Sequence, residues 1–251
     1  GNGIDHYVFA LATDDAGNLY AGGRFTSAGG ASVNHIAKWH GTAWSRLVSG
    51  MNNFVYALAV DDAGNLYAGG HFTMAGGISA NHVAKWDART SSWSPMGNGI
   101  DCDHCYVRAL AVDRVNGPIY AGGDFYGTGL GHVAKWDGTA WSSLGSGVWG
   151  VEYPMVFALA VDRAGNLYVG GVFTYASGVR ANYIARWVAF TRPLVSSGMN
   201  DIVYALALDD AGNLYAGGHF TMAGGISANG VAKWDGTAWS PLGSGIGHPY
   251  Y

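Results

Sequence analysis

The stretch VYALAVDDAGNLYAGGHFTMAGGISANHVAKWD, from Val55 to Asp87, returns at Val203 to Asp235 with only two changes. Val60 becomes Leu208, and His82 becomes Gly230. Such internal repetition predicts an architecture of stacked copies, in which each unit buries its apolar surface against its neighbours. The fold of one unit therefore decides the fold of the chain.

Looser copies fill the rest of the 251 residues, and a diglycine marks each of them at spacings of 47, 53, 48 and 47 residues. The diglycines are Gly22-Gly23, Gly69-Gly70, Gly122-Gly123, Gly170-Gly171 and Gly217-Gly218. An unbroken repeat favours one domain over residues 1–251. Its units cover roughly 1–50, 51–97, 98–147, 148–198 and 199–245, with a tail at 246–251.

Each copy reads as four short strands separated by turn residues. In the second copy the expected strands are Val55 to Val60, Leu66 to Gly70, His82 to Asp87 and Trp93 to Met96. The first strand is apolar on consecutive positions, which is typical of a strand covered on both faces. Five units of four antiparallel strands predict an all-β fold, a five-bladed β-propeller.

Three further positions are occupied in every copy by the same kind of residue. A tryptophan in the third strand is expected to fill the wedge between blades; it stands at Trp39, Trp86, Trp136, Trp187 and Trp234. Acidic and cationic residues recur as well and predict hydrogen bonds or ion pairs within or between blades. They are Asp14, Asp61, Asp113, Asp162 and Asp209, and Lys38, Lys85, Lys135, Arg186 and Lys233.

The diglycine after Leu-Tyr-Ala, followed by an aromatic residue and then a Trp, resembles the kelch repeat. Trp86 and Trp93, separated by six residues, are most similar to the kelch pattern, and the other copies shorten that gap. The segment from Ala57 to Tyr67 is similar to the repeats of bacterial β-propellers. The resemblance implies the fold alone, because kelch-like propellers include both binding scaffolds and an oxidase.

Composition excludes several classes of function. A net charge of -4 without a basic stripe disfavours nucleic-acid binding. No apolar run approaches the length of about 18 residues that a membrane-spanning helix needs, so membrane insertion is not expected. Low lysine content and aromatic-rich β repeats favour a secreted or cell-surface protein.

Cys102 and Cys105 form a Cys-x-x-Cys pair with His104 between them. A disulfide in an oxidising compartment is the first interpretation. Free thiols and a metal site remain open, although a metal needs a fourth donor from Asp103, His6 or His248. We therefore expect neither a metal nor a cofactor.

Departures from the repeat are where chemistry is expected, because residues shared by all copies are explained by packing. Two connections between blades are longer than the rest, Asn98 to Cys105 and Val148 to Met155. Long loops on one face form the expected binding surface. Its candidate ligand-binding residues are Asp103, His104, Trp149, Glu152 and Tyr153.

Glu152 is the only glutamate of the chain. A polysaccharide hydrolase would need a second carboxylate beside it, from Asp103, Asp124 or Asp201. No spacing requires that approach, so the chain is not expected to be an enzyme.

The C-terminal tail repeats in degenerate form the sequence that precedes each blade. Its residues Ile246, His248, Tyr250 and Tyr251 are predicted to take part in assembly, within a longer chain or between protomers. Near-identical blades present equivalent surfaces, whereas an enzyme needs one asymmetric site. The sequence therefore favours a non-catalytic extracellular module that binds or builds structure, as a self-assembling surface or fibre, with protein (possibly itself) or glycan as partner. A carbohydrate-binding lectin and a hydrolase using Glu152 are the alternatives.

Overall fold

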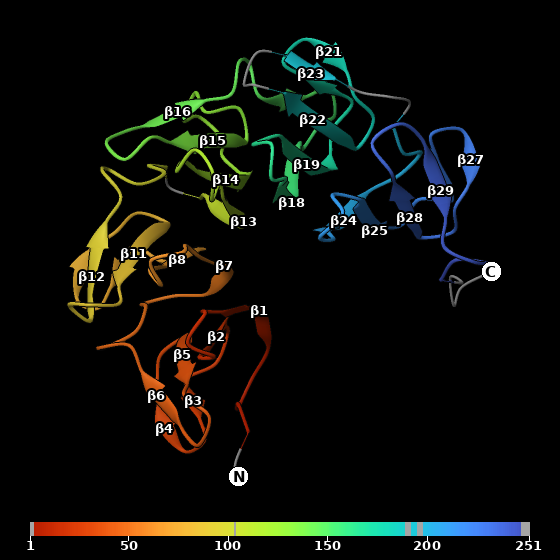
Figure 1. Cartoon of the computed structure of the whole chain (residues 1–251). Helices are drawn as coiled ribbons and strands as arrows, with labels where there is room; N and C mark the ends of the chain where they lie inside the picture. The colour runs from red at the N-terminus through yellow and green to blue at the C-terminus, as the bar shows by residue number, and fades with distance from the viewer. Residues whose placement is uncertain (1–2, 103, 189–191, 195–197, 247–251) are drawn as a thin grey trace.

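The computed structural model describes residues 3–102, 104–188, 192–194 and 198–246. Regular structure in these residues is entirely β, and five four-stranded antiparallel sheets contain most of it. We call these sheets blades 1 to 5 (Figure 1). In every blade the strands follow chain order across the sheet.

Blade 1 contains β1 (Val8–Thr13), β2 (Leu19–Gly23), β5 (Ile36–Trp39) and β6 (Trp44–Arg46). Blade 2 contains β7 (Val55–Val60), β8 (Leu66–Gly70), β11 (Val83–Asp87) and β12 (Ser92–Pro95). Blade 3 contains β13 (Tyr106–Val112), β14 (Ile119–Asp124), β15 (Val133–Trp136) and β16 (Trp141–Ser143). Blade 4 contains β18 (Met155–Val161), β19 (Leu167–Val172), β22 (Ile184–Val188) and β23 (Arg192–Leu194). Blade 5 contains β24 (Val203–Leu208), β25 (Leu214–Gly218), β28 (Val231–Trp234) and β29 (Trp239–Pro241).

The four strands predicted for the second copy are confirmed to within one residue at each end. The third strand begins at Val83 because His82 has a φ of 65°. All copies share this left-handed conformation at the equivalent position, with Tyr183 at 63° and Gly230 at 74° among them. Glycine adopts it freely, which explains how Gly230 can replace His82 in an otherwise conserved segment.

Small hairpins lie between the second and third strands of four blades, and the sequence did not predict them. They are β3 (Ser27–Ala28) with β4 (Ala31–Ser32), β9 (Met74–Ala75) with β10 (Ile78–Ser79), β20 (Tyr175–Ala176) with β21 (Val179–Arg180), and β26 (Met222–Ala223) with β27 (Ile226–Ser227). In blade 4 the two-residue strand β17 (Val148–Trp149) pairs with β20 and extends the hairpin to three strands.

The blades follow one another in an arc, with their first strands on the inside (Figure 1). Consecutive first strands pack on each other, from β1 on β7 through to β18 on β24. The predicted closure into a ring of five is not present, because the arc is open between β24 and β1 (Figure 1). The same contact between first strands joins each blade to the next. In the described chain, this arrangement leaves blade 1 and blade 5 apart.

The hydrophobic core lies between blades. Four of its clusters each join two consecutive blades, while a fifth belongs to blade 1 alone. Each contact places a valine of one first strand against a diglycine of the preceding blade. A Cβ added at Gly69 would overlap Cγ1 of Val107, and one added at Gly22 would lie 2.6 Å from Cγ1 of Val55. The diglycines therefore allow the close approach of neighbouring sheets.

In blades 1, 2, 4 and 5 the repeated aspartate and the repeated cation meet at a tyrosine between them. In blade 2, Asp61 accepts hydrogen bonds from the Asn65 backbone N–H at 2.8 Å, the Asn65 amide at 2.9 Å and the Tyr67 hydroxyl at 2.9 Å. The Nζ atom of Lys85 lies 5.7 Å from the centre of the Tyr67 ring. The prediction of hydrogen bonds within the blades is confirmed for the aspartates.

The expectation for the tryptophans of the third strand holds only in part. Trp86 and Trp187 are buried in clusters that join two blades. Trp39, Trp136 and Trp234 are half-buried, so the wedge does not enclose them.

Candidate functional site

The hairpin between second and third strands covers the second tryptophan of a blade. In blade 2 it packs over Trp93, where a Cβ added at Gly76 would lie 2.6 Å from the indole Cδ1. Trp93 is only 7% exposed as a result. Blades 1 and 5 repeat the arrangement, with Gly29 against Trp44 and Gly224 against Trp239.

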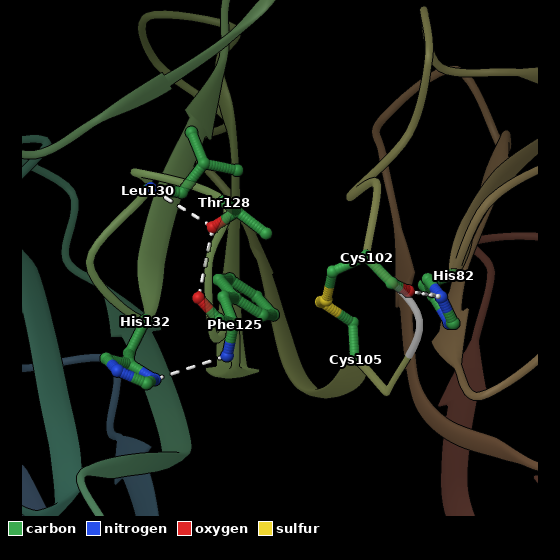
Figure 2. The surroundings of a disulfide bond; sticks show 7 residues. All are labelled: His82, Cys102, Cys105, Phe125, Thr128, Leu130 and His132. Atoms are coloured by element: carbon green, nitrogen blue, oxygen red, sulfur yellow. Dashed lines mark hydrogen bonds between the residues drawn. A yellow bond between two sulfur atoms is a disulfide. The ribbon is translucent and has the colours of Figure 1, made fainter.

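Blade 3 has no such hairpin in its connection from Phe125 to His132, all of which is described. A tight turn replaces it: the Thr128 hydroxyl donates to the Phe125 carbonyl at 3.1 Å and accepts from the Leu130 N–H at 3.1 Å (Figure 2). Trp141, the counterpart of Trp93, is partly buried, as Trp44 and Trp239 are beneath their hairpins. Its indole N–H donates to the Met96 carbonyl at 3.0 Å, which fixes the ring from the side of blade 2.

A cavity of about 370 Å³ occupies the space beside these tryptophans. The rings of Trp136 and Trp141 have centroids 5.5 Å apart and form its aromatic wall. Its polar lining includes Asp101, Asn98, Thr128 and Thr139. An aromatic wall faced by a few hydrogen-bonding groups is the usual composition of a small-molecule site.

Asp101 lines this cavity and two neighbouring ones of about 430 and 360 Å³. Its counterparts in blades 1, 2 and 5 cap the hairpin; in blade 2, Asn52 Oδ1 accepts the backbone N–H groups of Thr73 and Met74 at 2.9 Å. Without a hairpin, the exposed carboxylate of Asp101 accepts no hydrogen bond from the residues that the structure describes. It is therefore available to a ligand.

A disulfide between Cys102 and Cys105 closes the loop that follows Asp101, with Cα atoms 5.6 Å apart (Figure 2). Cys105 is buried in the cluster between blades 2 and 3. On the other side, His82 Nε2–H donates to the Cys102 carbonyl at 3.1 Å. These two attachments hold the backbone next to Asp101, one toward blade 3 and one toward blade 2.

The predicted ligand-binding residues do not form one site. His104 lines the cavity of about 430 Å³ together with Asp101 and Tyr126, whereas Asp103 lies outside the described residues. Burial raises the pKa of Tyr126, and Asp124 and Tyr153 raise it further. Tyr153 is exposed on the loop before β18.

Trp149 belongs to blade 4 instead, where its ring stacks on Tyr175 with centroids 4.3 Å apart. Glu152 is exposed on the loop that follows. Of the residues predicted for assembly, Ile246 is exposed and donates its N–H to the Asn229 carbonyl at 2.8 Å. His248, Tyr250 and Tyr251 lie outside the described residues.

A row of side chains along the innermost strands was missed by sequence reasoning. One position of the first strand carries Phe9, Tyr56, Arg108, Phe157 and Tyr204. Phe9 contacts Tyr56 at 5.2 Å between centroids, and Arg108 lies 5.7 Å from the rings of Tyr56 and Phe157. Arg108 also donates to Asp124 Oδ2 from Nε at 3.1 Å and from Nη2 at 2.9 Å. Asp124, one of the carboxylates considered as a partner of Glu152, is held in this pair.

We predict that stability falls as the pH is lowered from about 7 to about 5, because buried histidines must be neutral in the folded protein. Burial lowers the pKa of His82 and of His132 below the value of the unfolded chain. The stabilisation is complete when the pH is above the histidine pKa of the unfolded chain. It is lost as the pH falls toward the lower histidine pKa of the folded protein. Urea unfolding at a series of pH values measures it. The variant His82→Gly, which copies the fifth repeat, should show a smaller decline; a stability that rises on acidification would contradict the prediction.

The described residues contain no group of three or more His, Cys, Asp or Glu side chains arranged to hold a metal ion. Nor do they contain a helix that is long and apolar enough to span a membrane.

Comparison with known proteins shows similarity in fold only. No protein-family profile and no curated protein sequence matches this chain. The fold is similar to that of 404 chains of solved structures, so it does not by itself single out a function. One is the extracellular domain of a protein described as a one-component system from B. thetaiotaomicron, with a TM-score of 0.56 and 12% sequence identity. The match covers 90% of this chain and 27% of that one.

Proposed function

We propose that this chain is a non-catalytic extracellular binding module that recognises a glycan in the cavity of blade 3. Its repeated unit is a β-propeller blade of the kelch-like or bacterial tandem-repeat type. The observation that carries the proposal is the cavity in blade 3, where the hairpin of the other blades is missing and Trp136 and Trp141 lie beside Asp101. The repeat serves as an internal control, because the equivalent space in blade 2 is filled.

Carbohydrate is the ligand class that fits this lining. A sugar ring has an apolar C–H face that packs on an aromatic ring, and hydroxyls that donate to carboxylates and exchange hydrogen bonds with amides and hydroxyls. The cavity offers both kinds of surface, with an indole wall and with Asp101, Asn98 and Thr139. Its volume of about 370 Å³ lies at the lower end of the range of small-ligand pockets.

Two observations support a binding role outside the cell. The disulfide of Cys102 and Cys105 is typical of proteins in oxidising compartments. The similar fold of a bacterial extracellular domain agrees with the same location. Binding is favoured over hydrolysis because Asp124, a possible partner of Glu152, is occupied by Arg108.

A glycan array, followed by calorimetric titration of the strongest ligands, tests the proposal. We expect Asp101→Ala to weaken binding about tenfold or more, since a hydrogen bond to a charged group contributes about 1.5–3 kcal/mol. Its thermal unfolding should be unchanged, because the side chain is exposed and bonds to no described residue. Asp15→Ala, at an exposed aspartate in a turn of blade 1, is the control.

A loop graft provides a second, stricter test. Replacing residues 126–131 with residues 73–81 of the second copy installs the hairpin that covers Trp93 in blade 2. The graft should abolish glycan binding while the protein remains folded. The proposal would be refuted if the wild-type protein bound no glycan on the array. It would also be refuted if Asp101→Ala and the loop graft both bound with unchanged affinity.

A further inference from the structure

Among the described residues, the outer face of blade 5 is an inter-blade surface without a neighbour. Of these residues, a Cβ added at Gly217 would meet only Ala205, at 3.9 Å, whereas the equivalent Gly22, Gly69, Gly122 and Gly170 each abut a valine of the following blade. The exposure of Leu242 supports the same conclusion. Leu242 is 40% exposed, whereas its counterparts in blades 1 to 3 are at most 4% exposed; they are Leu47, Met96 and Leu144. The face is thus apolar, indented and open.

The opposite end of the arc presents the matching surface. Val8 and Leu11 on β1 occupy the positions of Val55 and Leu58 on β7. Val55 is buried against Gly22, and the Leu58 side chain packs on the same glycine. Val8 and Leu11 are 39% and 61% exposed, because no blade precedes them in the described chain.

The two faces are complementary because the repeat makes them copies of surfaces that already fit each other. Residues 203–235 differ from residues 55–87 at two positions only, so the face of Gly217 reproduces that of Gly69. Gly69 receives Val107 and Leu110 of blade 3. Val8 and Leu11 present the same two residue types in the same spacing.

We infer that the arc associates head to tail with a second copy of the chain, with Val8 and Leu11 of one protomer seated on Gly217 and Leu242 of the next. This surface is independent of the glycan site. Repeat proteins that remain monomeric end in units with polar outer faces. Here both terminal faces are apolar, and another copy of the chain carries the complement of each. The new contact continues the interface that joins every pair of blades.

The geometry also predicts the kind of assembly. A head-to-tail contact produces a ring if the rotation closes and an open chain if it does not. The opening of the arc in Figure 1 is narrower than the arc itself, so a second copy cannot complete a flat ring. Successive protomers must step along the axis, and the assembly grows as a spiral.

Sedimentation velocity over a range of protein concentrations tests the inference. The wild-type mass should increase with concentration beyond that of a dimer. Leu11→Arg places a charge on one end, and Gly217→Val fills the other; each variant alone should remain monomeric. An equimolar mixture should form a dimer and stop, because only one pair of competent ends remains. Val115→Arg, at an exposed apolar residue of blade 3, is the control and should assemble as the wild type does.

Each other outcome overturns the inference. A wild type that is monomeric at every concentration excludes association, and a mixture that remains monomeric excludes the head-to-tail arrangement. A monomeric wild type that Gly217→Val destabilises would show that blades 1 and 5 close on each other within one chain. Association by either single variant would place the interface elsewhere.

Discussion

Replacing Arg108 with phenylalanine is expected to lower the free energy of unfolding by about 3 kcal/mol, the lower end of the range for breaking a buried ion pair. Arg108 makes two hydrogen bonds to Oδ2 of Asp124, whose residue is 8% exposed. The other carboxylate oxygen, Oδ1, is buried without a hydrogen-bond partner. Removing the guanidinium therefore leaves a buried charge without compensation. We expect the lower end of this free-energy range because the Arg108 side chain is 30% exposed.

The chain supplies the matched control for this variant. Blade 4 carries Phe157 and Val172 at the positions of Arg108 and Asp124, and the two strands pair in the same register. The double variant Arg108→Phe, Asp124→Val therefore transplants a pair that blade 4 already accommodates. Urea unfolding at neutral pH should show most of the stability restored. A double variant as unstable as the single one would mean that lost packing, and not the unpaired carboxylate, causes the effect.

The strands of each blade could be predicted from the sequence, because local patterns determine them. Turn residues such as Gly64 and the apolar run of Val55 to Val60 give the limits of β7 and β8 directly. The pair of Arg108 and Asp124 was missed although its signal was present. Both depart from the repeat, at positions that antiparallel pairing of the first two strands brings close together.

The site on blade 3 was missed for a similar reason. The long connections around Cys102 and Trp149 are the most visible departures from the repeat, whereas the informative change is a deletion. Gly122 to Lys135 contains three residues fewer than Gly69 to Lys85, and that deletion removes the hairpin. The sequence contains no comparable indication that the arc is open, because the opening depends on the angle between packed sheets. The repeat period specifies the unit but not this angle.

Gly69→Ala and Gly217→Ala, the same substitution in two nearly identical repeats, should have opposite consequences. The new methyl group at position 69 overlaps Cγ1 of Val107 and lies 3.1 Å from its Cβ. Val107 is fully buried and its branched side chain cannot turn away, so blades 2 and 3 must separate. Overpacking of this kind costs about 1–3 kcal/mol, and we expect the upper half of that range because the contact is rigid.

Gly217→Ala adds the same group to an open face, where Ala205 is the only described residue within 4 Å of it. Alanine in a strand is favoured over glycine by about 0.5–1 kcal/mol, so this variant should be unchanged or slightly more stable. Chemical unfolding at a protein concentration too low for association measures both. Equal destabilisation by the two substitutions would show that Gly217 is covered in solution as Gly69 is. The difference between them therefore reports directly on whether the last blade has a neighbour, which the sequence identity of the two repeats cannot reveal.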